Sequence, residues 1–320
     1  MRTITLEEHF STPEVLKTTT KDAGAVPEFM KLLQARLLDL GQGRIADMDA
    51  SGIDVQVLSL AASGLDKLEP ATATALARDT NDTLAAAVKA HPYRFSAFGT
   101  LALLEPEKAA AEFERCIRQL GFKGIMLNGT TNGLFLDHPS FTPLFEAAQH
   151  LDVPIYLHPA PPPPPVQEAY YRGLPGNLGF FLSTAAWGWH VETGMHCLRL
   201  IVSGLFDRFP KLKIIIGHMG EDLPYSIVRA EDVFARGAKH LQRRITEYFQ
   251  EHFHITTSGY FTLPPYLCAL QVVGADRILF SVDYPFSANA TGREFLNILP
   301  ASKEDLEKIA HRNAERLLKL

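Results

Sequence analysis

Several features that mark common protein classes are scarce or missing in this sequence of 320 residues. Its three cysteines lie far apart without a Cys-x-x-Cys pair, which fits reduced thiols and excludes a disulfide framework. The 31 Lys and Arg against 36 Asp and Glu give a formal net charge of −5, which argues against a nucleic-acid partner. No run reaches the roughly 18 apolar residues of a membrane span, and the N-terminal segment lacks the apolar region of a signal peptide. We therefore expect a cytoplasmic protein without a membrane partner.

Two catalytic motifs are also missing. The sequence has no Gly-x-Ser-x-Gly, which excludes an α/β-hydrolase, and no Walker A motif. Gly41-x-Gly43-x-x-Ala46 has the spacing of a dinucleotide fingerprint, but it follows a predicted helix where the fingerprint needs a strand. These absences leave the order of the predicted elements to indicate the fold.

Short apolar runs alternate with segments of helical periodicity along the whole chain. One such segment, 105–120, places its apolar residues on one face, and the last predicted helix begins at Ser302 with Asp305 in capping-box spacing. The predicted strands cover residues 3–6, 55–60, 95–101, 124–127, 155–157, 214–216, 253–256 and 278–282. Eight strand–helix units with near-continuous apolar strands predict a parallel (β/α)₈ TIM barrel.

The sequence predicts one domain over residues 1–320, because no change of composition indicates a linker. Two connections are longer than usual, 11–54 after the first strand and 159–190 after the fifth. We interpret both as loop insertions over the active-site mouth of the barrel. The second contains the proline run 161–165, which we expect to be neither helix nor strand.

Polar residues follow the predicted strands where a barrel builds its active site, at the C-terminal strand ends. They are Glu7, Glu8, His9, Asn128, His158, His218, Glu221 and Asp283. A lone histidine is commonly a core or surface residue, but histidines at the ends of three strands are difficult to explain by packing. Trp187, Trp189 and Tyr284 are candidates to stack on an aromatic substrate, with ordinary packing as the alternative.

The strand-end residues include a candidate metal site. Glu7 and His9 are two residues apart, so their side chains point the same way on an extended segment, with Glu8 opposite. Together with His158 and Asp283 they offer two imidazoles and two carboxylates. That set suits Mn²⁺ or Zn²⁺ better than the all-oxygen shell of Ca²⁺, and Mg²⁺ is a weaker match.

Blocks spread over nearly the whole chain resemble the metal-dependent decarboxylases of the amidohydrolase superfamily, the group that contains γ-resorcylate and 2,3-dihydroxybenzoate decarboxylases. The blocks lie at 6–10, 151–159, 204–210, 216–221, 255–259, 276–286 and 313–320. The resemblance implies reversible decarboxylation of a hydroxybenzoate, a small aromatic carboxylic acid, by a homo-oligomer, a dimer or tetramer.

The resemblance also implies roles for individual residues. One metal ion is held by Glu7, His9, His158 and Asp283, while His218 and Glu221 match the catalytic His and Glu of the family. Asn128 and Arg229 match positions of the substrate pocket. For Arg229, a surface salt bridge with Glu231 or Asp232 is the alternative.

The opening motif points to the decarboxylase branch. Hydrolytic members commonly open with His-x-His and carry a modified Lys at the end of strand four, whereas this chain has Glu7-x-His9 and Asn128, with Lys123 at the other end of that strand. The segment 23–26 lacks an aromatic residue that the resorcylate enzymes share, and prolines 161–165 replace their Arg-Asn. Both departures bear on the identity of the substrate.

Decarboxylation of an aromatic acid requires a proton at the ring carbon that loses CO₂. Asp283 is the candidate general acid if one of its oxygens is free of the metal, and His218, oriented by Glu221, is a candidate relay. One alternative is a mononuclear hydrolase of an amide or lactone with Asp283 as base. Another is a metal- or ligand-binding barrel without catalysis, which does not need the pair His218 and Glu221.

Overall fold

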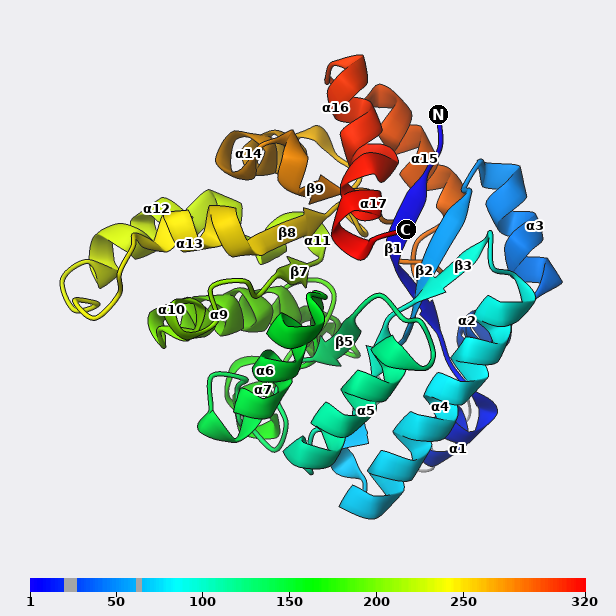
Figure 1. The fold of residues 1–320 in the computed structure, drawn as a ribbon, viewed down its shortest axis with the longest axis horizontal. Coiled ribbons are helices and arrows are strands. Elements are labelled where there is room, and N and C mark those ends of the chain that lie inside the picture. Colours follow the sequence, from blue (N-terminus) through cyan, green and yellow to red (C-terminus); the bar gives the residue numbers. More distant parts are fainter. Residues whose placement is uncertain (20–27, 62–64) are drawn as a thin grey trace.

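Parallel strands surrounded by helices make up this computed structural model, which describes residues 1–19, 28–61 and 65–320 (Figure 1). The strands are β1 Ile4–Phe10, β2 Val55–Leu60, β3 Phe95–Ala97, β4 Gly99–Thr100, β5 Ile125–Asn128, β6 Ile155–His158, β7 Ile214–Ile216, β8 Phe253–Thr256 and β9 Ile278–Leu279. The helices are α1 Pro13–Thr19, α2 Glu28–Leu38, α3 Gln42–Ser51, α4 Pro70–Ala90, α5 Pro106–Arg118, α6 Thr142–Leu151, α7 Pro164–Tyr170, α8 Leu178–Ser183, α9 Gly188–Val202, α10 Leu205–Arg208, α11 His218–Glu221, α12 Leu223–Phe234, α13 Ile245–His252, α14 Leu263–Val273, α15 Asn289–Ile298, α16 Lys303–Glu307 and α17 Asn313–Leu318.

The strands form two parallel sheets in chain order, β1-β2-β3 and β4-β5-β6-β7-β8-β9. The predicted strand 95–101 is interrupted at Phe98, whose N–H donates to Leu58 on one side while the next residue, Gly99, donates to Gly124 on the other. A Cβ on Gly99 would lie 2.8 Å from Cys116 Sγ, so α5 can pack against the interruption only because this residue is glycine. The hydrogen-bonded ladder is therefore divided between β3 and β4, where the sequence predicted one continuous strand.

Both faces of the strands are buried. Along β6, Ile155 and Leu157 belong to the large core under the helices, whereas Tyr156 between them belongs to a smaller cluster on the opposite face. Ile215 of β7 and Met126 of β5 join the same smaller cluster. This double burial explains why the strands read as continuous apolar runs rather than alternating ones.

The first strand meets the segment that follows β9. The His9 N–H donates to the Tyr284 carbonyl at 2.6 Å, and Glu8 and Tyr284 form a parallel bridge. Ser281 Oγ accepts from the Glu7 N–H at 2.7 Å. These contacts join the two ends of the strand series, although β1 and β9 form no common ladder.

β1 extends beyond its predicted end and contains a bulge. The strand runs to Phe10, so Glu7, Glu8 and His9 lie within it rather than after it. Between Thr5 and Glu8, β1 advances by three residues while β2 advances by two, from Gln56 to Leu58. The extra residue reverses the side-chain alternation at this point.

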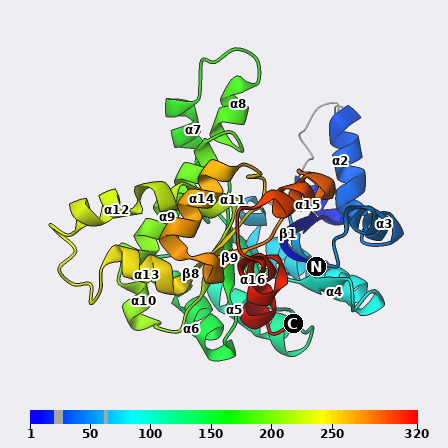
Figure 2. The ribbon, with the colours of Figure 1, turned by 90° about the horizontal axis from the view of Figure 1, so that it is seen from above.

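The two long connections are largely helical where the structure describes them. The first contains α1, α2 and α3, and the second contains α7 and α8, which project from the rest of the chain (Figure 2). The expectation that prolines 161–165 exclude helix was wrong, because α7 begins at Pro164. Proline is tolerated in a first helical turn, where its missing N–H has no partner within the helix. The departure at 23–26 lies outside the described residues.

Two helix predictions are confirmed. α5 buries Ala109, Phe113 and Cys116 on one face, and Ser302 caps α16 by accepting from the Asp305 N–H at 3.1 Å. A turn with π-helical hydrogen bonds, Lys308–Arg312, connects α16 to α17. Among the described helices, none is both long enough and apolar enough to cross a membrane.

Arg44 of α3 binds the C-terminal end of β1. Its guanidinium is fully buried and donates to the His9 carbonyl at 2.6 Å, to Gln56 Oε1 at 3.3 Å and, through Nε, to the Asp39 carbonyl at 2.8 Å. The guanidinium also lies over the Tyr284 ring, with Cζ 4.8 Å from the ring centroid. One side chain thus connects β1, β2 and the segment after β9.

We predict that Arg44→Ala lowers the free energy of unfolding by about 3 kcal/mol, because buried carbonyls lose charged donors. Urea unfolding followed by circular dichroism measures this loss. The control is Arg78→Ala, which removes an exposed guanidinium 3.7 Å from Glu112 and should cost at most about 0.5 kcal/mol, because Glu112 keeps its pair with Arg115. Equal losses in the two variants would show that Arg44 has no special structural role.

Candidate active site

Four side chains from the beginning, middle and end of the chain converge at the C-terminal ends of the strands. His158 Nε2 lies 3.1 Å from Glu7 Oε1, and His9 Nε2 lies 3.3 Å from Asp283 Oδ1. The His9 and His158 rings meet edge to face with centroids 4.8 Å apart. The structure therefore brings together the four residues that the sequence selected as metal ligands.

The Glu7 carboxylate uses its two oxygens differently. Oε2 accepts hydrogen bonds from the hydroxyls of Tyr156, Thr256 and Ser258. Oε1 is buried and has no hydrogen-bond partner among the described residues. One oxygen is thus held in place by the protein, which leaves the other to face the imidazoles.

His9 and His158 are each held through Nδ1, which directs Nε2 of both rings into the site. His9 Nδ1 lies 3.3 Å from Ser59 Oγ, and His158 Nδ1 lies 2.8 Å from the Pro159 carbonyl, so both rings turn Nε2 towards Glu7 and Asp283. His9 Nε2 is buried without a hydrogen-bond partner in the described part of the chain. Outer partners on Nδ1 with Nε2 left free are typical of metal-ligating histidines. Orphaned acceptor atoms on Glu7 and His9 fit a divalent cation.

Glu8, on the opposite side of the strand, holds Asp283. Its carboxylate accepts from the backbone N–H groups of Val282 at 2.9 Å and Tyr284 at 3.1 Å, the two neighbours of Asp283. Burial raises the pKa of Glu8 to about 8. Asp283 has φ of +75°, a strained conformation for a residue with a side chain, and these two hydrogen bonds stabilise it.

His218 and Glu221 lie on a left-handed turn. Residues 218–222 all have positive φ, between 50° and 91°. One helical turn separates residues three apart, so both side chains point the same way, and His218 Nδ1 lies 2.8 Å from Glu221 Oε1. His218 Nε2 is then directed at the metal-ligand cluster, 3.5 Å from Glu7 Oε1 and 3.9 Å from Asp283 Oδ2.

The charges in this buried group compensate one another. Burial alone would raise the pKa of Glu7, but the surrounding imidazoles, His218 foremost, hold that pKa well below its usual value. Burial opposes protonation of His218, yet the Glu7 and Glu221 carboxylates raise its pKa well above the usual value. The pKa of Glu221 is lowered, because His218 and His190 outweigh the effect of burial. Among these groups, the carboxylates favour their anionic form and His218 its cationic form.

His190 is a residue that the sequence did not indicate. Its Nδ1 lies 2.7 Å from Glu221 Oε2, on the other side of the carboxylate from His218. His190 lies in α9, far in the sequence from the end of any strand. The search for polar residues directly after strands, which selected the other histidines, therefore did not find it. Its position near the start of the helix that follows the long connection carried no signal.

The residues predicted to bind substrate lie in different surroundings, and of these Trp187 is exposed. Asn128 ends β5, and its buried Oδ1 has no hydrogen-bond partner among the described residues. Trp189 is half-buried, with Nε1 3.2 Å from His190 Nε2. Tyr284 is buried beneath Arg44. Arg229 is exposed on α12, and the structure shows no ion pair between it and Glu231 or Asp232 in the described residues.

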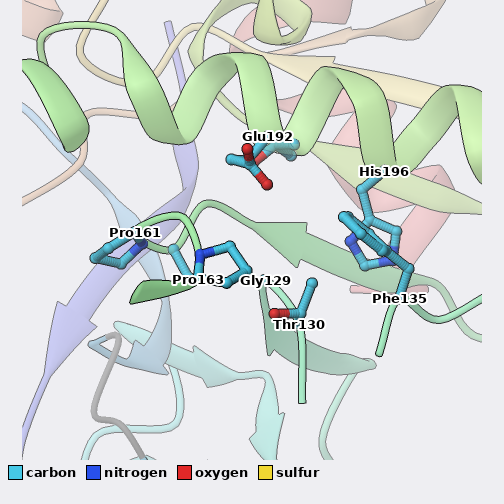
Figure 3. A pocket seen from close by; sticks show the side chains of 9 residues that line it. Gly129, Thr130, Phe135, Pro161, Pro163, Glu192 and His196 are labelled. Atoms are coloured by element: carbon cyan, nitrogen blue, oxygen red, sulfur yellow. The ribbon is translucent and has the colours of Figure 1, made fainter. Parts of the chain in front are cut away.

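One cavity borders the site, and a second, smaller one is lined by none of the predicted site residues. One, of about 250 Å³, lies beside His218 and is lined by Met219, Asp222, Pro224, Tyr225, Tyr260, Pro264, Pro265 and Cys268. The other is small, about 10 Å³, and lies between α9 and the loops after β5 and β6. Figure 3 shows Glu192 of α9 above Pro161 and Pro163, with His196 beside Phe135. The start of the proline run therefore lies under α9.

Comparisons with known proteins place these features in a family. A family model described as amidohydrolase matches residues 26–320. A γ-resorcylate decarboxylase of Rhizobium radiobacter is 41% identical over 329 residues, covering 99% of this chain and 98% of the relative. The crystal structure of a 2,6-dihydroxybenzoate decarboxylase with 2,6-dihydroxybenzoate has a TM-score of 0.92 at 40% identity, covering 100% of both chains. A Polaromonas dihydroxybenzoic acid decarboxylase with bound manganese and 2-nitroresorcinol has a TM-score of 0.91 at 40% identity, covering 100% of this chain and 97% of that chain.

We predict that His158→Ala and Glu7→Ala each reduce bound Mn²⁺ or Zn²⁺ to well below one ion per chain, since three remaining ligands hold the ion weakly. Elemental analysis after gel filtration measures the content, and circular dichroism verifies the fold. His138→Ala is the control, because His138 only caps a short helix and is exposed. Full occupancy in both ligand variants would refute the assignment.

Proposed function

Because the chain belongs to the amidohydrolase family, we propose that it is a metal-dependent carboxy-lyase that removes CO₂ from a hydroxybenzoate without oxidation. Relatives that match 99% of the chain at about 40% identity are named γ-resorcylate decarboxylase. A dihydroxybenzoate with a free ortho-hydroxyl group is the substrate class that these relatives support. The reaction is reversible in principle, so the same site carboxylates a phenol when bicarbonate is concentrated.

The observation that carries this proposal is the position of Asp283 between two imidazoles. One of its oxygens lies 3.3 Å from His9 Nε2, on the side of the metal ligands, and the other lies 3.9 Å from His218 Nε2. A carboxylate bound only through its first oxygen keeps the second available for a proton. This arrangement supports Asp283 as both metal ligand and general acid.

Glu7, His9, His158 and Asp283 would hold one divalent ion, for which manganese in the related structures favours Mn²⁺ over Zn²⁺. When bound, this ion lowers the pKa of an ortho-hydroxyl group and fixes the neighbouring carboxylate of the substrate. The protein's own part is to deliver one proton to the ring carbon. The electrons of the breaking carbon–carbon bond then restore the aromatic ring as CO₂ leaves.

His218, Asp283 and Glu221 control that proton. The Glu7 and Glu221 carboxylates favour a protonated His218, whose Nε2, 3.9 Å from Asp283 Oδ2, faces the oxygen to which it would return a proton after each turnover. Asn128 offers its free Oδ1 to a substrate hydroxyl, and Trp189 offers a ring face. Arg229 and Tyr284 are the other proposed substrate-binding residues, and the exposed Arg229 guanidinium forms no ion pair among the described residues, which favours a role in binding a carboxylate.

We also propose that the two sheets belong to one closed barrel. The contacts of β1 with residues 281–284 support a closed (β/α)₈ barrel, with one domain over 1–320 and with the segments after β1 and β6 as insertions at its mouth. All three cysteines are free thiols, two of them buried, which supports a reducing compartment such as the cytoplasm.

An apolar surface on α7, α8 and the start of α9 supports a homo-oligomer, a dimer or tetramer. Phe180 and Phe181 of α8 are 62% and 52% exposed, and Trp187 is 53% exposed. Tyr170 and Leu178 extend the same surface. Large aromatic side chains grouped on a projecting pair of helices are typical of subunit interfaces, and a second copy of this chain is the proposed partner.

We predict that Phe180→Glu combined with Phe181→Glu converts the oligomer into a species near the monomer mass of 35.5 kDa. Buried carboxylates without partners would make association unfavourable. Size-exclusion chromatography with light scattering measures the mass. Tyr93→Glu, at a site 88% exposed in an unrelated turn, should leave the mass unchanged. A wild-type monomer, or a double variant with the wild-type mass, would contradict the proposed interface.

We predict that in D₂O the enzyme converts an ortho-hydroxybenzoate into a phenol with one deuterium at the former carboxyl position. Ring protonation requires a hydrogen from solvent, whereas hydrolysis of an amide or lactone leaves ring hydrogens untouched. Mass spectrometry and NMR of the product, over a panel of hydroxybenzoates, detect the label. Asp283→Asn should lower the rate of turnover far more than it weakens substrate binding, provided that metal is retained.

One result would overturn the proposed function, and another would overturn the role of Asp283. If no hydroxybenzoate in the panel loses CO₂ while the protein turns over an amide or lactone, the protein is a hydrolase of the same family. If Asp283→Asn keeps wild-type turnover with full metal content, Asp283 is not the acid.

A further inference from the structure

We propose that His190 is a positioning residue for the reaction, which acts by holding Glu221 in the orientation that directs His218 at the substrate. The proposal rests on the proposed function, because it assigns His218 a part in proton transfer. It adds a residue that lies outside the metal cluster and that acts only through a shared carboxylate.

One carboxylate connects the two imidazoles. Glu221 Oε2 lies 2.7 Å from His190 Nδ1, and Glu221 Oε1 lies 2.8 Å from His218 Nδ1. Since each oxygen is committed to a different ring, the plane of the carboxylate is fixed by both contacts together. Loss of the His190 contact would free the carboxylate to rotate and would weaken its hold on His218.

Burial makes the His190 contact necessary. Glu221 is 1% exposed, so water cannot replace a lost donor to Oε2 without rearrangement. An ionised carboxylate oxygen left unpaired in such a site carries a large desolvation cost. His190 Nδ1–H supplies the donor that the ionised form of Glu221 requires.

The imidazole of His190 is itself held on several sides. Its Nε2 lies 3.0 Å from the Ala185 carbonyl and 3.2 Å from Trp189 Nε1. The ring packs edge to face against His218, with centroids 4.8 Å apart, and against Tyr260 at 5.5 Å. These contacts leave Nδ1 only one direction, towards Glu221.

The backbone brings α9 close to the left-handed turn. A Cβ on Gly194, one turn after His190, would lie 2.7 Å from the Glu221 carbonyl oxygen. Only glycine permits this approach of helix and turn. The helix is thus fitted to the backbone of Glu221 independently of the hydrogen bond between the two side chains.

The first test compares His190→Ala with His190→Asn in the manganese-loaded enzyme. The amide nitrogen of Asn can replace Nδ1 as donor, whereas Ala removes the donor. We expect Ala to lower kcat roughly tenfold to a hundredfold, as loss of an outer hydrogen-bond partner does. KM and bound manganese should stay near wild type, and Asn should restore most of the lost kcat. An unchanged kcat in His190→Ala would overturn the proposal.

The second test is a double-mutant cycle with Glu221→Ala. If His190 acts through Glu221, His190→Ala causes no further loss of kcat once the carboxylate is gone. A purely structural role predicts that the two losses multiply, and that outcome would overturn the proposal. His196→Ala is the matched control, since His196 is equally buried on α9 but accepts from the Leu136 N–H at 2.8 Å, away from Glu221. It should cost stability but leave kcat unchanged.

Crystal structures of the manganese-loaded wild type and His190→Ala separate this proposal from the proposed function. If the wild type decarboxylates no hydroxybenzoate, the proposed function fails, and the positions of Glu221 and His218 still decide the role of His190. A rotated Glu221 with the His218 contact broken supports positioning. A carboxylate that stays within hydrogen-bond distance of His218 Nδ1 refutes it. Should the Ala variant not fold, His190→Phe, which keeps a ring but removes the donor to Glu221, takes its place in both the kinetic and the structural comparison with the Asn variant.

Discussion

The hydrogen bonds between β1 and residues 281–284 are the constraint on which the site depends. Glu8 binds the N–H groups on both sides of Asp283, and the His9 N–H donates to the Tyr284 carbonyl. Two of the four candidate metal ligands lie in β1 and a third, Asp283, lies near the other end of the chain. Together with Arg44, which contacts both His9 and Tyr284, these hydrogen bonds keep Asp283 beside His9 and compensate for its strained φ.

The buried charges follow one pattern throughout the site. Glu7 and Glu221 each commit one oxygen to a fixed protein donor and present the other to an imidazole of the candidate site. His158 commits Nδ1 in the same way and leaves Nε2 free. Such outer partners hold the reacting atoms in place before substrate binds, which reduces the reorganisation that the reaction requires.

Backbone strain is concentrated where the chemistry is proposed. His218, Glu221 and Asp283 all have positive φ, although none of them is glycine. In the left-handed turn, this strain places His218 and Glu221 on one side, which a normal strand end would not do. His218 and Glu221 are buried and Asp283 is held by Glu8, so the surrounding contacts oppose relaxation of this strain.

The order of strands and helices, α5 with its buried face and the polar residues at the strand ends could all be predicted, because apolar periodicity and capping are local properties. The bulge in β1 could not. Leu6 belongs to the smaller cluster that also contains Tyr156, so simple alternation would point Glu7 and His9 to the opposite face of β1. The extra residue between Thr5 and Glu8 reverses the alternation and turns both side chains to the same face as that cluster. His190 was likewise missed, because its partner is 31 residues away. The sequence by itself therefore determined which side chains are available and the family to which they belong. Only tertiary structure decided which face of β1 carries Glu7 and which histidine shares Glu221, since both depend on contacts between segments that no local pattern records.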